Sequence, residues 1–227
     1  MEKGVAKKTL LSWSSGKDSA WALHQLQQNS AYEVVGLFTT VSETYQRVAM
    51  HGVRIELLRQ QANIIGLPLT LISLPTPCTN TQYEERMRKF IEHAQRQGIE
   101  CMAFGDLLLE DIRDYRIQQL AAYPIEAVFP LWGLATDTLP ITMLEAGVEA
   151  IITCLDPKRM PAGFAGQKLS KEILAALPID TDLSGERGEY HTLVINGPMM
   201  KSPLSVKVGE TVARDNLLFT DVLLQSR

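Results

Sequence analysis

The sequence predicts an α/β protein in which a parallel sheet carries helices on both of its faces. The first observation behind this prediction is that strand patterns alternate with amphipathic helix patterns between residues 9 and 129. The second is that these strand patterns are almost continuously apolar, as expected for strands that helices cover on both sides. Ligands of such sheets bind at the carboxyl ends of the strands, so we expect the functional loops there.

The elements of this sheet have recognisable ends in the sequence. A first strand with Leu10, Leu11 and Trp13 leads through a serine-rich loop into a helix. The later strands are predicted at 33–40, 69–74, 99–104 and 125–129. Amphipathic helices are predicted at 52–65, stopped by Gly66 and Pro68, from Thr79 or Thr81 to Gly98, and from Ile112 to Ala121.

A looser pattern after residue 134 predicts a smaller C-terminal α/β domain. We place the boundary there, which gives domains 1–134 and 135–227 without a long linker between them. Helices are expected at 135–146 and 170–177, and strands at 148–155, 191–195, 204–208 and 216–224.

The composition excludes several classes of protein. The chain has 227 residues, of which 45% are hydrophobic and 21% charged, and its net charge of −4 disfavours a broad nucleic-acid-binding surface. No apolar run reaches the ~20 residues that span a bilayer, and the N-terminus lacks the apolar core of a signal peptide, so we expect a cytoplasmic protein without a membrane partner. Cys78, Cys101 and Cys154 form no CxxC pair, which disfavours zinc, iron–sulfur and disulfide sites.

The loop Ser-Ser-Gly-Lys-Asp-Ser at 14–19 is the strongest functional signal. A small-residue loop between a strand and a helix directs backbone N–H groups and the helix N-terminus toward one point, which favours phosphate binding. Gly16 permits close approach of an anion, and Lys17 adds a positive charge. An ordinary capped turn is the alternative, but the packed order of these residues favours nucleotide phosphate. Because Asp18 follows the lysine, the loop is not the P-loop that ends in Gly-Lys-Ser/Thr.

Two further stretches carry charged residues in loops. Residues 182–192 bring two carboxylates and an imidazole together between glycines, and their chemistry alone slightly favours a solvated hairpin turn over a site. In the stretch 105–116, Arg113 and Arg116 fit ion pairs on their own helix as well as they fit binding of a phosphate or carboxylate. His51, taken alone, is typical of a structural histidine.

The loop at 14–19 resembles the S-G-G-x-D-S loop of the N-type ATP pyrophosphatases, which belong to the adenine nucleotide alpha hydrolase superfamily, with Ser15 replacing the first glycine. The chain as a whole resembles the diphthine–ammonia ligase family. This resemblance rests on W-S-S-G-K-D-S-A at 13–20, M-H at 50–51, F-G-D at 104–106 with Tyr115-Arg116, P-L-W-G at 130–133 and D-x-x-G-E-x-G-E-Y-H-T at 182–192. The last motif is long and specific. Because of it, we interpret residues 182–192 as a functional segment and not as a solvated hairpin turn.

The resemblance implies a Rossmann-like ATP-binding domain, a C-terminal α/β substrate domain and an active site between them. The reaction of the family converts the diphthine carboxylate on an elongation factor to its amide, with ATP and ammonium as co-substrates and AMP and pyrophosphate as products. ATP and Mg²⁺ are therefore the expected cofactors. The expected partners are ammonia and a carboxylate-bearing substrate, either protein-bound diphthine or a small acid, and a homodimer stays open as the assembly.

The resemblance also implies roles for individual residues. The catalytic residues are expected to be Lys17, Asp18, Glu186, Glu189 and His191, with Asp18 also binding the metal. ATP is expected to contact Ser14, Ser15, Gly16, Lys17, Asp18, Ser19, Met50 and His51. The substrate is expected to contact Gly105, Asp106, Tyr115, Arg116, Gly188, Tyr190 and Thr192.

Two other functions stay open at this point. One is tRNA modification by a pyrophosphate-loop enzyme, for which the absent CxxC pair and the acidic balance disfavour thiolation but not amination. The other is a non-catalytic module that binds or senses adenine nucleotides, in which Ser15 would mark a degenerate loop.

Overall fold

The computed structural model describes residues 5–48 and 51–225. Its first sheet contains β1 (Lys7–Ser12), β2 (Tyr32–Ser42), β3 (Leu69–Leu74), β4 (Cys101–Ala103) and β5 (Glu126–Val128). These strands are all parallel and lie in the order β3-β2-β1-β4-β5. The predicted α/β class with a parallel, Rossmann-like sheet is thereby confirmed.

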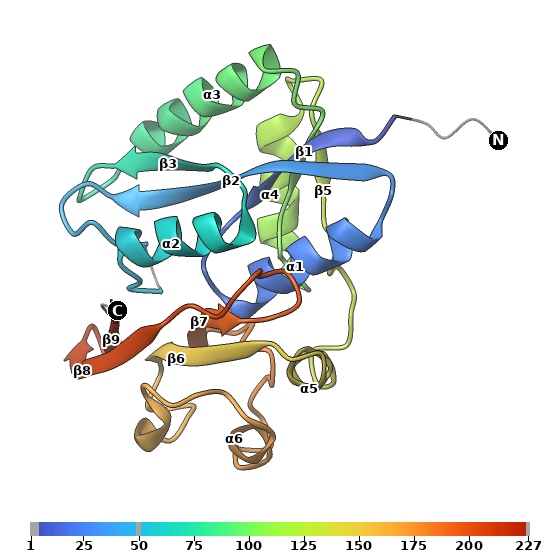
Figure 1. Ribbon diagram of the computed structural model, residues 1–227. Coiled ribbons are helices and arrows are strands. Elements are labelled where there is room, and N and C mark those ends of the chain that lie inside the picture. Colours follow the sequence, from blue (N-terminus) through green and yellow to red (C-terminus); the bar gives the residue numbers. More distant parts are fainter. Residues whose placement is uncertain (1–4, 49–50, 226–227) are drawn as a thin grey trace.

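Four helices cover the two faces of this sheet: α1 (Lys17–Gln28), α2 (Ile55–Ile65), α3 (Asn80–Arg96) and α4 (Glu110–Leu120). Helices α3 and α4 pack on one face, and α1 and α2 pack on the other (Figure 1). The predicted N-cap of α3 is Thr79, whose side chain accepts from the Gln82 N–H in a capping box.

The second sheet is antiparallel and has the order β7-β6-β9-β8. Its strands are β6 (Glu149–Leu155), β7 (Tyr190–Asn196), β8 (Val206–Arg214) and β9 (Leu217–Leu224), and α5 (Leu139–Glu145), the short 3₁₀ helix η1 (Ala162–Phe164) and α6 (Lys171–Ala175) accompany them. The strand predicted at 204–208 is longer than expected, because β8 and β9 form a hairpin. Asp215 (φ 51°) and Asn216 (φ 64°) make its turn, as residues that tolerate positive φ do.

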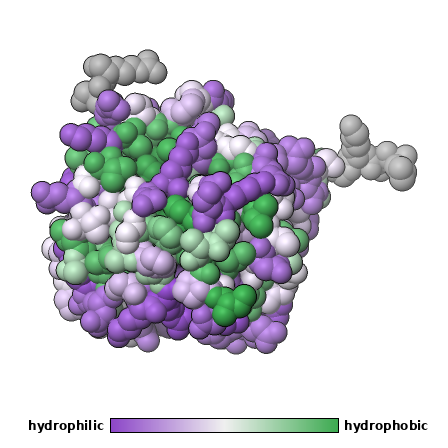
Figure 2. Space-filling model, turned by 90° about the horizontal axis from the view of Figure 1, so that it is seen from below, coloured by the Kyte–Doolittle hydropathy of each residue, from purple (hydrophilic) through white to green (hydrophobic). Residues whose placement is uncertain are grey.

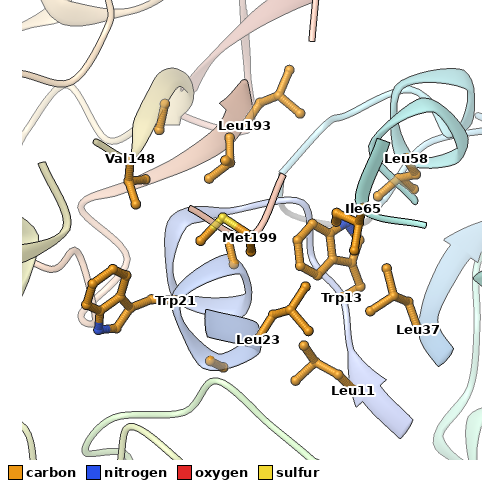
Figure 3. Close-up of a cluster of buried hydrophobic side chains, with 14 of the residues drawn as sticks. Leu11, Trp13, Trp21, Leu23, Leu37, Leu58, Ile65, Val148, Leu193 and Met199 are labelled. Atoms are coloured by element: carbon orange, nitrogen blue, oxygen red, sulfur yellow. The ribbon is translucent and has the colours of Figure 1, made fainter. Parts of the chain in front are cut away.

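The two sheets share one hydrophobic core. Helices α1 and α2 lie between them, and a single cluster of buried side chains runs from the first sheet through these helices to the second sheet (Figure 1). In Figure 3, Met199 lies between Leu23 of α1 and Leu193 of β7. The predicted boundary at 134 falls between β5 and α5, but the segments on its two sides are packed together.

An ion-pair cluster also ties the two sheets together. Asp221 of β9 accepts hydrogen bonds from Arg54 Nε at 3.0 Å, Arg54 Nη2 at 2.6 Å and Arg47 Nη1 at 2.9 Å. Both arginines belong to the segment between β2 and the first turn of α2, so the connection after β2 is fixed to the second sheet.

The surface on the side of the second sheet mixes polar and apolar residues, with the apolar ones gathered mainly in the upper left of the view (Figure 2). Edge strand β8 exposes Val208 and Val212, and Lys207 and Glu210 interrupt its apolar residues. Within the described residues, no helix combines the length and the apolar character needed to cross a membrane.

Candidate functional site

The serine-rich loop joins β1 to α1 as the sequence predicts. Strand β1 ends at Ser12 and α1 begins at Lys17, with Gly16 as its N-cap residue. Ser15 adopts a left-handed backbone conformation with φ 77°, and its buried hydroxyl has no hydrogen-bond partner among the described residues. A residue with a Cβ is strained in this conformation. This is the physical reason why the S-G-G-x-D-S loop has a glycine at the position of Ser15. The strain and the unpaired hydroxyl occur together where a ligand is expected.

The loop lies directly against β7 of the second sheet. The Lys17 N–H donates to Thr192 Oγ1 at 3.1 Å, and the Val194 N–H donates to the Ser15 carbonyl at 2.9 Å. A Cβ on Gly16 would lie 3.0 Å from His51 Cε1 and 3.2 Å from the Thr192 carbonyl oxygen. The late motif at 182–192 and the early loop at 14–19 are therefore neighbours in space, although 175 positions separate Lys17 from Thr192.

Gln61 of α2 holds this junction together. Its side chain is fully buried, accepts from Trp13 Nε1 at 2.9 Å and donates to the carbonyls of Ser15 at 3.2 Å and Val194 at 2.7 Å. Sequence analysis missed this residue. The available signal was an amide side chain on the apolar face of an amphipathic helix, where a polar group needs buried partners.

Lys17 is buried and already paired. Its Nζ donates to both carboxylate oxygens of Asp18 at 2.9 Å and to the carbonyl of Ser184, and it lies 5.2 Å from the ring centroid of Tyr190. Burial lowers the pKa of Lys17, but Asp18, Tyr190 and Glu186 together more than offset this, so the net pKa is above its ordinary value. The site thus contains a permanent positive charge next to the loop. The carbonyl of Ser184, in the turn at 182–192, helps to hold this ammonium in place.

Side chains of the turn at 182–192 accept hydrogen bonds from its own backbone. Asp182 accepts from the Ser184 N–H at 2.8 Å and from Thr136 Oγ1 at 2.8 Å. The buried carboxylate of Glu189 accepts from the N–H groups of Asp182 at 3.2 Å and Arg187 at 2.9 Å. These contacts commit Glu189 to holding the turn, whereas Glu186 makes no such bonds to its own turn.

Tyr190 and Gly188 also shape this turn. The Tyr190 hydroxyl donates to the Leu183 carbonyl at 2.6 Å, and its ring packs so closely that a Cβ on Gly185 would lie 3.1 Å from the ring. Gly188 has φ 84°, which favours glycine, and no atom of the described residues lies within 4 Å of where its Cβ would stand.

Three groups of the site have pKa values that burial shifts from their ordinary range. Burial, with the nearby charge of Asp18, raises the pKa of Glu186 to about 7. Burial, with the nearby charge of Lys17, lowers the pKa of His191 to about 4. Burial, with the imidazole of His191, lowers the pKa of His51 to about 3. The two rings pack with centroids 4.6 Å apart and are neutral at pH 7, so both can accept hydrogen bonds.

The end of β4 brings a further carboxylate to the loop. A Cβ on Gly105 would lie 3.1 Å from the Asp18 carbonyl carbon, so a glycine permits this close approach. Burial raises the pKa of the adjacent Asp106, opposed by Arg116, and Asp106 Oδ2 is buried without a partner among the described residues. Asp106 also acts electrostatically on Glu186, which places three carboxylates, those of Asp18, Asp106 and Glu186, around the loop.

Two expected substrate contacts lie further out on α4. The Tyr115 hydroxyl accepts from Gln119 Nε2 at 3.0 Å, and Arg116 Nη1 donates to the Tyr83 hydroxyl at 3.4 Å. Among the described residues, their side-chain hydrogen bonds are thus with α3 and α4 and not with the loop at 14–19. Met50, expected to contact ATP, lies outside the described residues. Ser14 and Ser19 complete the loop, with their hydroxyl oxygens 3.2 Å apart.

A cavity of about 790 Å³ opens at the carboxyl ends of β2 and β3. The hairpin of β8 and β9 forms its other wall, and Gly52, the neighbour of His51, lines it. Its volume lies within the range of small-molecule sites. Sequence analysis did not predict its wall, because hairpin residues such as Phe219 reach it only through the packing of the second sheet.

The fold and the loop define the class of this protein: a Rossmann-like α/β protein whose serine-rich loop lies at the carboxyl edge of a parallel sheet, where ligands of such sheets bind. The family model for the diphthamide synthase N-terminal domain matches residues 7–122, which is half of the chain, and the chain belongs to this family. Membership of this family indicates an ATP-utilising enzyme of the ATP-pyrophosphatase type. The matched residues include the loop but not the turn at 182–192. No curated protein matches the chain.

Proposed function

We propose that the protein is an ATP-dependent ligase that activates a carboxylate as an acyl adenylate and then amidates it with ammonia. The observation that carries this proposal is the contact between Lys17 and Thr192. It sets a turn with a titratable carboxylate and a neutral imidazole against the expected pyrophosphate loop. Family membership supports the use of ATP. The turn at 182–192 provides side chains for the second step, amide formation.

Activation of the acceptor is the first step of the proposal. A carboxylate reacts poorly with ammonia because its leaving group would be oxide. Attack of a carboxylate oxygen on the α-phosphorus breaks the bond to pyrophosphate and gives a mixed anhydride whose leaving group is AMP. The loop N–H groups and the buried ammonium of Lys17 stabilise the charge on the departing pyrophosphate.

The carboxylates around the loop fit a magnesium ion. Mg²⁺ prefers oxygen ligands and uses few from the protein, with phosphate oxygens completing its shell. Asp18 and Asp106 would hold it, and the unpaired Oδ2 of Asp106 fits this role. Within the described chain, no cluster of three or more His, Cys, Asp or Glu side chains forms a metal site by itself, as expected if phosphate supplies the remaining ligands. When bound, the ion neutralises charge on the phosphates.

Amide formation is the second step. The nitrogen of ammonia attacks the acyl carbon, AMP leaves, and the attacking nitrogen loses a proton. Glu186 is the best candidate to accept this proton, because its pKa of about 7 makes it a base near neutral pH. We assign His191 to orienting the reacting groups and Glu189 to positioning the turn, since the Glu189 carboxylate is engaged by two backbone N–H groups.

The nucleoside fits the apolar cavity at the ends of β2 and β3. Gly52 lines that cavity, and its neighbour His51 lies 3.0 Å from where a Cβ on Gly16 of the loop would stand. The acceptor then approaches from the opposite side, where β4 and β5 end and Asp106 lies. This arrangement leaves the α-phosphorus between the two sites, facing the turn at 182–192.

The test measures nucleotide products in the presence of Mg²⁺, ammonium and a panel of carboxylic acids, including diphthine-bearing elongation factor. We expect acid-dependent release of pyrophosphate and AMP. Glu186→Gln should retain acid-dependent ATP–pyrophosphate exchange and lose amide formation, whereas Lys17→Ala should lose both. Formation of ADP, or the absence of adenine nucleotide binding by calorimetry, would refute the proposal. Pyrophosphate release that depends on tRNA instead of an acid would assign the enzyme to tRNA modification.

A further inference from the structure

Two arginines of α4 are held on an aromatic block at the ends of β4 and β5. The Arg113 guanidinium carbon lies 4.2 Å from the ring centroid of Trp132, and that of Arg116 lies 4.9 Å from the ring centroid of Phe104. Phe129 joins these two rings, with centroid distances of 5.7 Å to Phe104 and 6.3 Å to Trp132. Stacking uses the flat face of a guanidinium and leaves the N–H groups along its edge for other partners.

These N–H groups are poorly satisfied within the protein. The Nε atoms of Arg113 and Arg116 are buried and have no hydrogen-bond partner among the described residues. The remaining polar contacts of the pair are long: 3.4 Å from Arg116 to the Tyr83 hydroxyl and 3.5 Å from Arg113 to Asp114. A buried donor without an acceptor is costly, so each of these guanidinium groups favours an added acceptor.

An oxyanion satisfies such donors best. The Nε and one Nη of an arginine can donate side by side to the two oxygens of a carboxylate. The triphosphate is the less suitable partner, because the loop has its own donors and the Asp106 carboxylate is coupled to Arg116 on one side and to Asp18 on the other. The negative charge of Asp106 therefore screens the arginines from the phosphates.

We infer that Arg113 and Arg116 bind a carboxylate of the acceptor, and that this is not the carboxylate that is activated. This inference rests on the proposed function. A carboxylate whose charge two arginines neutralise is a poor nucleophile, and the reacting one must face the α-phosphorus at the loop. Of the two acceptors left open, a small acid is therefore favoured over protein-bound diphthine: an acid with two or more carboxylates, one anchored on the arginine pair and one free to react.

The experiment compares dicarboxylates with monocarboxylates of the same chain length. Succinate, glutarate and adipate are titrated by calorimetry against butyrate, valerate and hexanoate, with full-length protein holding Mg²⁺ and a non-hydrolysable ATP analogue. We expect at least one dicarboxylate to bind about tenfold or more tightly than its monocarboxylate partner, because only the dicarboxylate keeps a second charge-assisted pair. The fluorescence of Trp132, which is less buried than Trp13 and Trp21, gives a second readout of the same site.

Variants decide whether the arginine pair is responsible. Arg113→Gln and Arg116→Gln should each remove the preference for the dicarboxylate, and the lysine variants should weaken it, since lysine keeps the charge but not the planar fork. Arg88→Gln, which removes an exposed arginine of α3 paired with Glu92, should keep it. The lysine variants keep the test valid if a glutamine variant fails to fold.

Equal binding of the two acid classes, absence of dicarboxylate binding, or a preference that survives both glutamine substitutions overturns the inference. Loss of ATP-analogue binding in the same variants would instead assign the arginines to the triphosphate, and also overturns it. Failure of the wild-type protein to bind the ATP analogue counts against the proposed function, which the same titration measures separately.

Discussion

The Lys17 N–H donates to Thr192 Oγ1 at 3.1 Å, which joins the first residue of α1 to a strand of the other sheet. The N-terminal N–H groups of a helix have no partner within the helix and need one from elsewhere. Here β7 supplies it, and this bond fixes the distance between the loop at 14–19 and the turn at 182–192.

Thr192→Val should destabilise the protein by about 1–3 kcal/mol, because it leaves the buried Lys17 N–H without an acceptor while keeping the shape of the side chain. Urea unfolding of both proteins measures this difference. Thr192→Ser keeps the hydroxyl and should recover most of the loss. A valine variant as stable as the wild type would show that the bond contributes nothing.

Gln61→Leu should be more damaging than its position on an amphipathic helix suggests. The substitution removes the partner of Trp13 Nε1 and of two carbonyls, and we expect a loss of at least about 2 kcal/mol. The matched control is Gln60→Leu on the exposed face of the same helix, which should change the unfolding free energy by less than about 0.5 kcal/mol. Equal effects of the two substitutions would contradict the assigned role of Gln61.

Ser15→Gly should stabilise the protein by about 1 kcal/mol. Glycine relieves the left-handed strain at φ 77° and removes a buried hydroxyl that has no partner, and these gains exceed its entropic cost in the unfolded chain. Ser15→Ala removes only the hydroxyl, so the difference between the two variants isolates the backbone effect. If thermal unfolding finds the glycine variant less stable than the alanine variant, the strain is not significant.

Glu186 and His191 should give opposite dependences of stability on pH. The folded pKa of Glu186, about 7, lies above its ordinary 4.5, so the folded state holds more protons between these values and stability falls as the pH rises through them. The folded pKa of His191, about 4, lies below its ordinary 6.5, so the unfolded state holds more protons and stability rises between pH 4 and 6.5.

Glu186→Gln separates these two effects. Its unfolding free energy relative to wild type should increase steadily from pH 4.5 to 7, because the unfavourable ionisation of Glu186 is gone. Chemical unfolding at several pH values measures this, with Glu210→Gln on the exposed strand β8 as the control. A constant difference between variant and wild type across this range would show that the pKa of Glu186 is not raised.

The sequence by itself determined the α/β class, the order of the elements and the loop at 14–19. These features follow from local sequence patterns: apolar strands, apolar residues at helical spacing, and the small residues between strand and helix. The sequence also supplied the motif at 182–192 and the family, because a long motif is specific without knowledge of its contacts.

Only the tertiary structure decided how these pieces meet. Gln61 has no local signature as the link between loop and β7, and the turn alone does not distinguish the engaged carboxylate of Glu189 from that of Glu186. The stacking of Arg113 on Trp132 likewise joins residues from different elements. Such relationships depend on side-chain packing across two sheets, which places residues far apart in the chain within hydrogen-bond distance and changes their pKa values by burial.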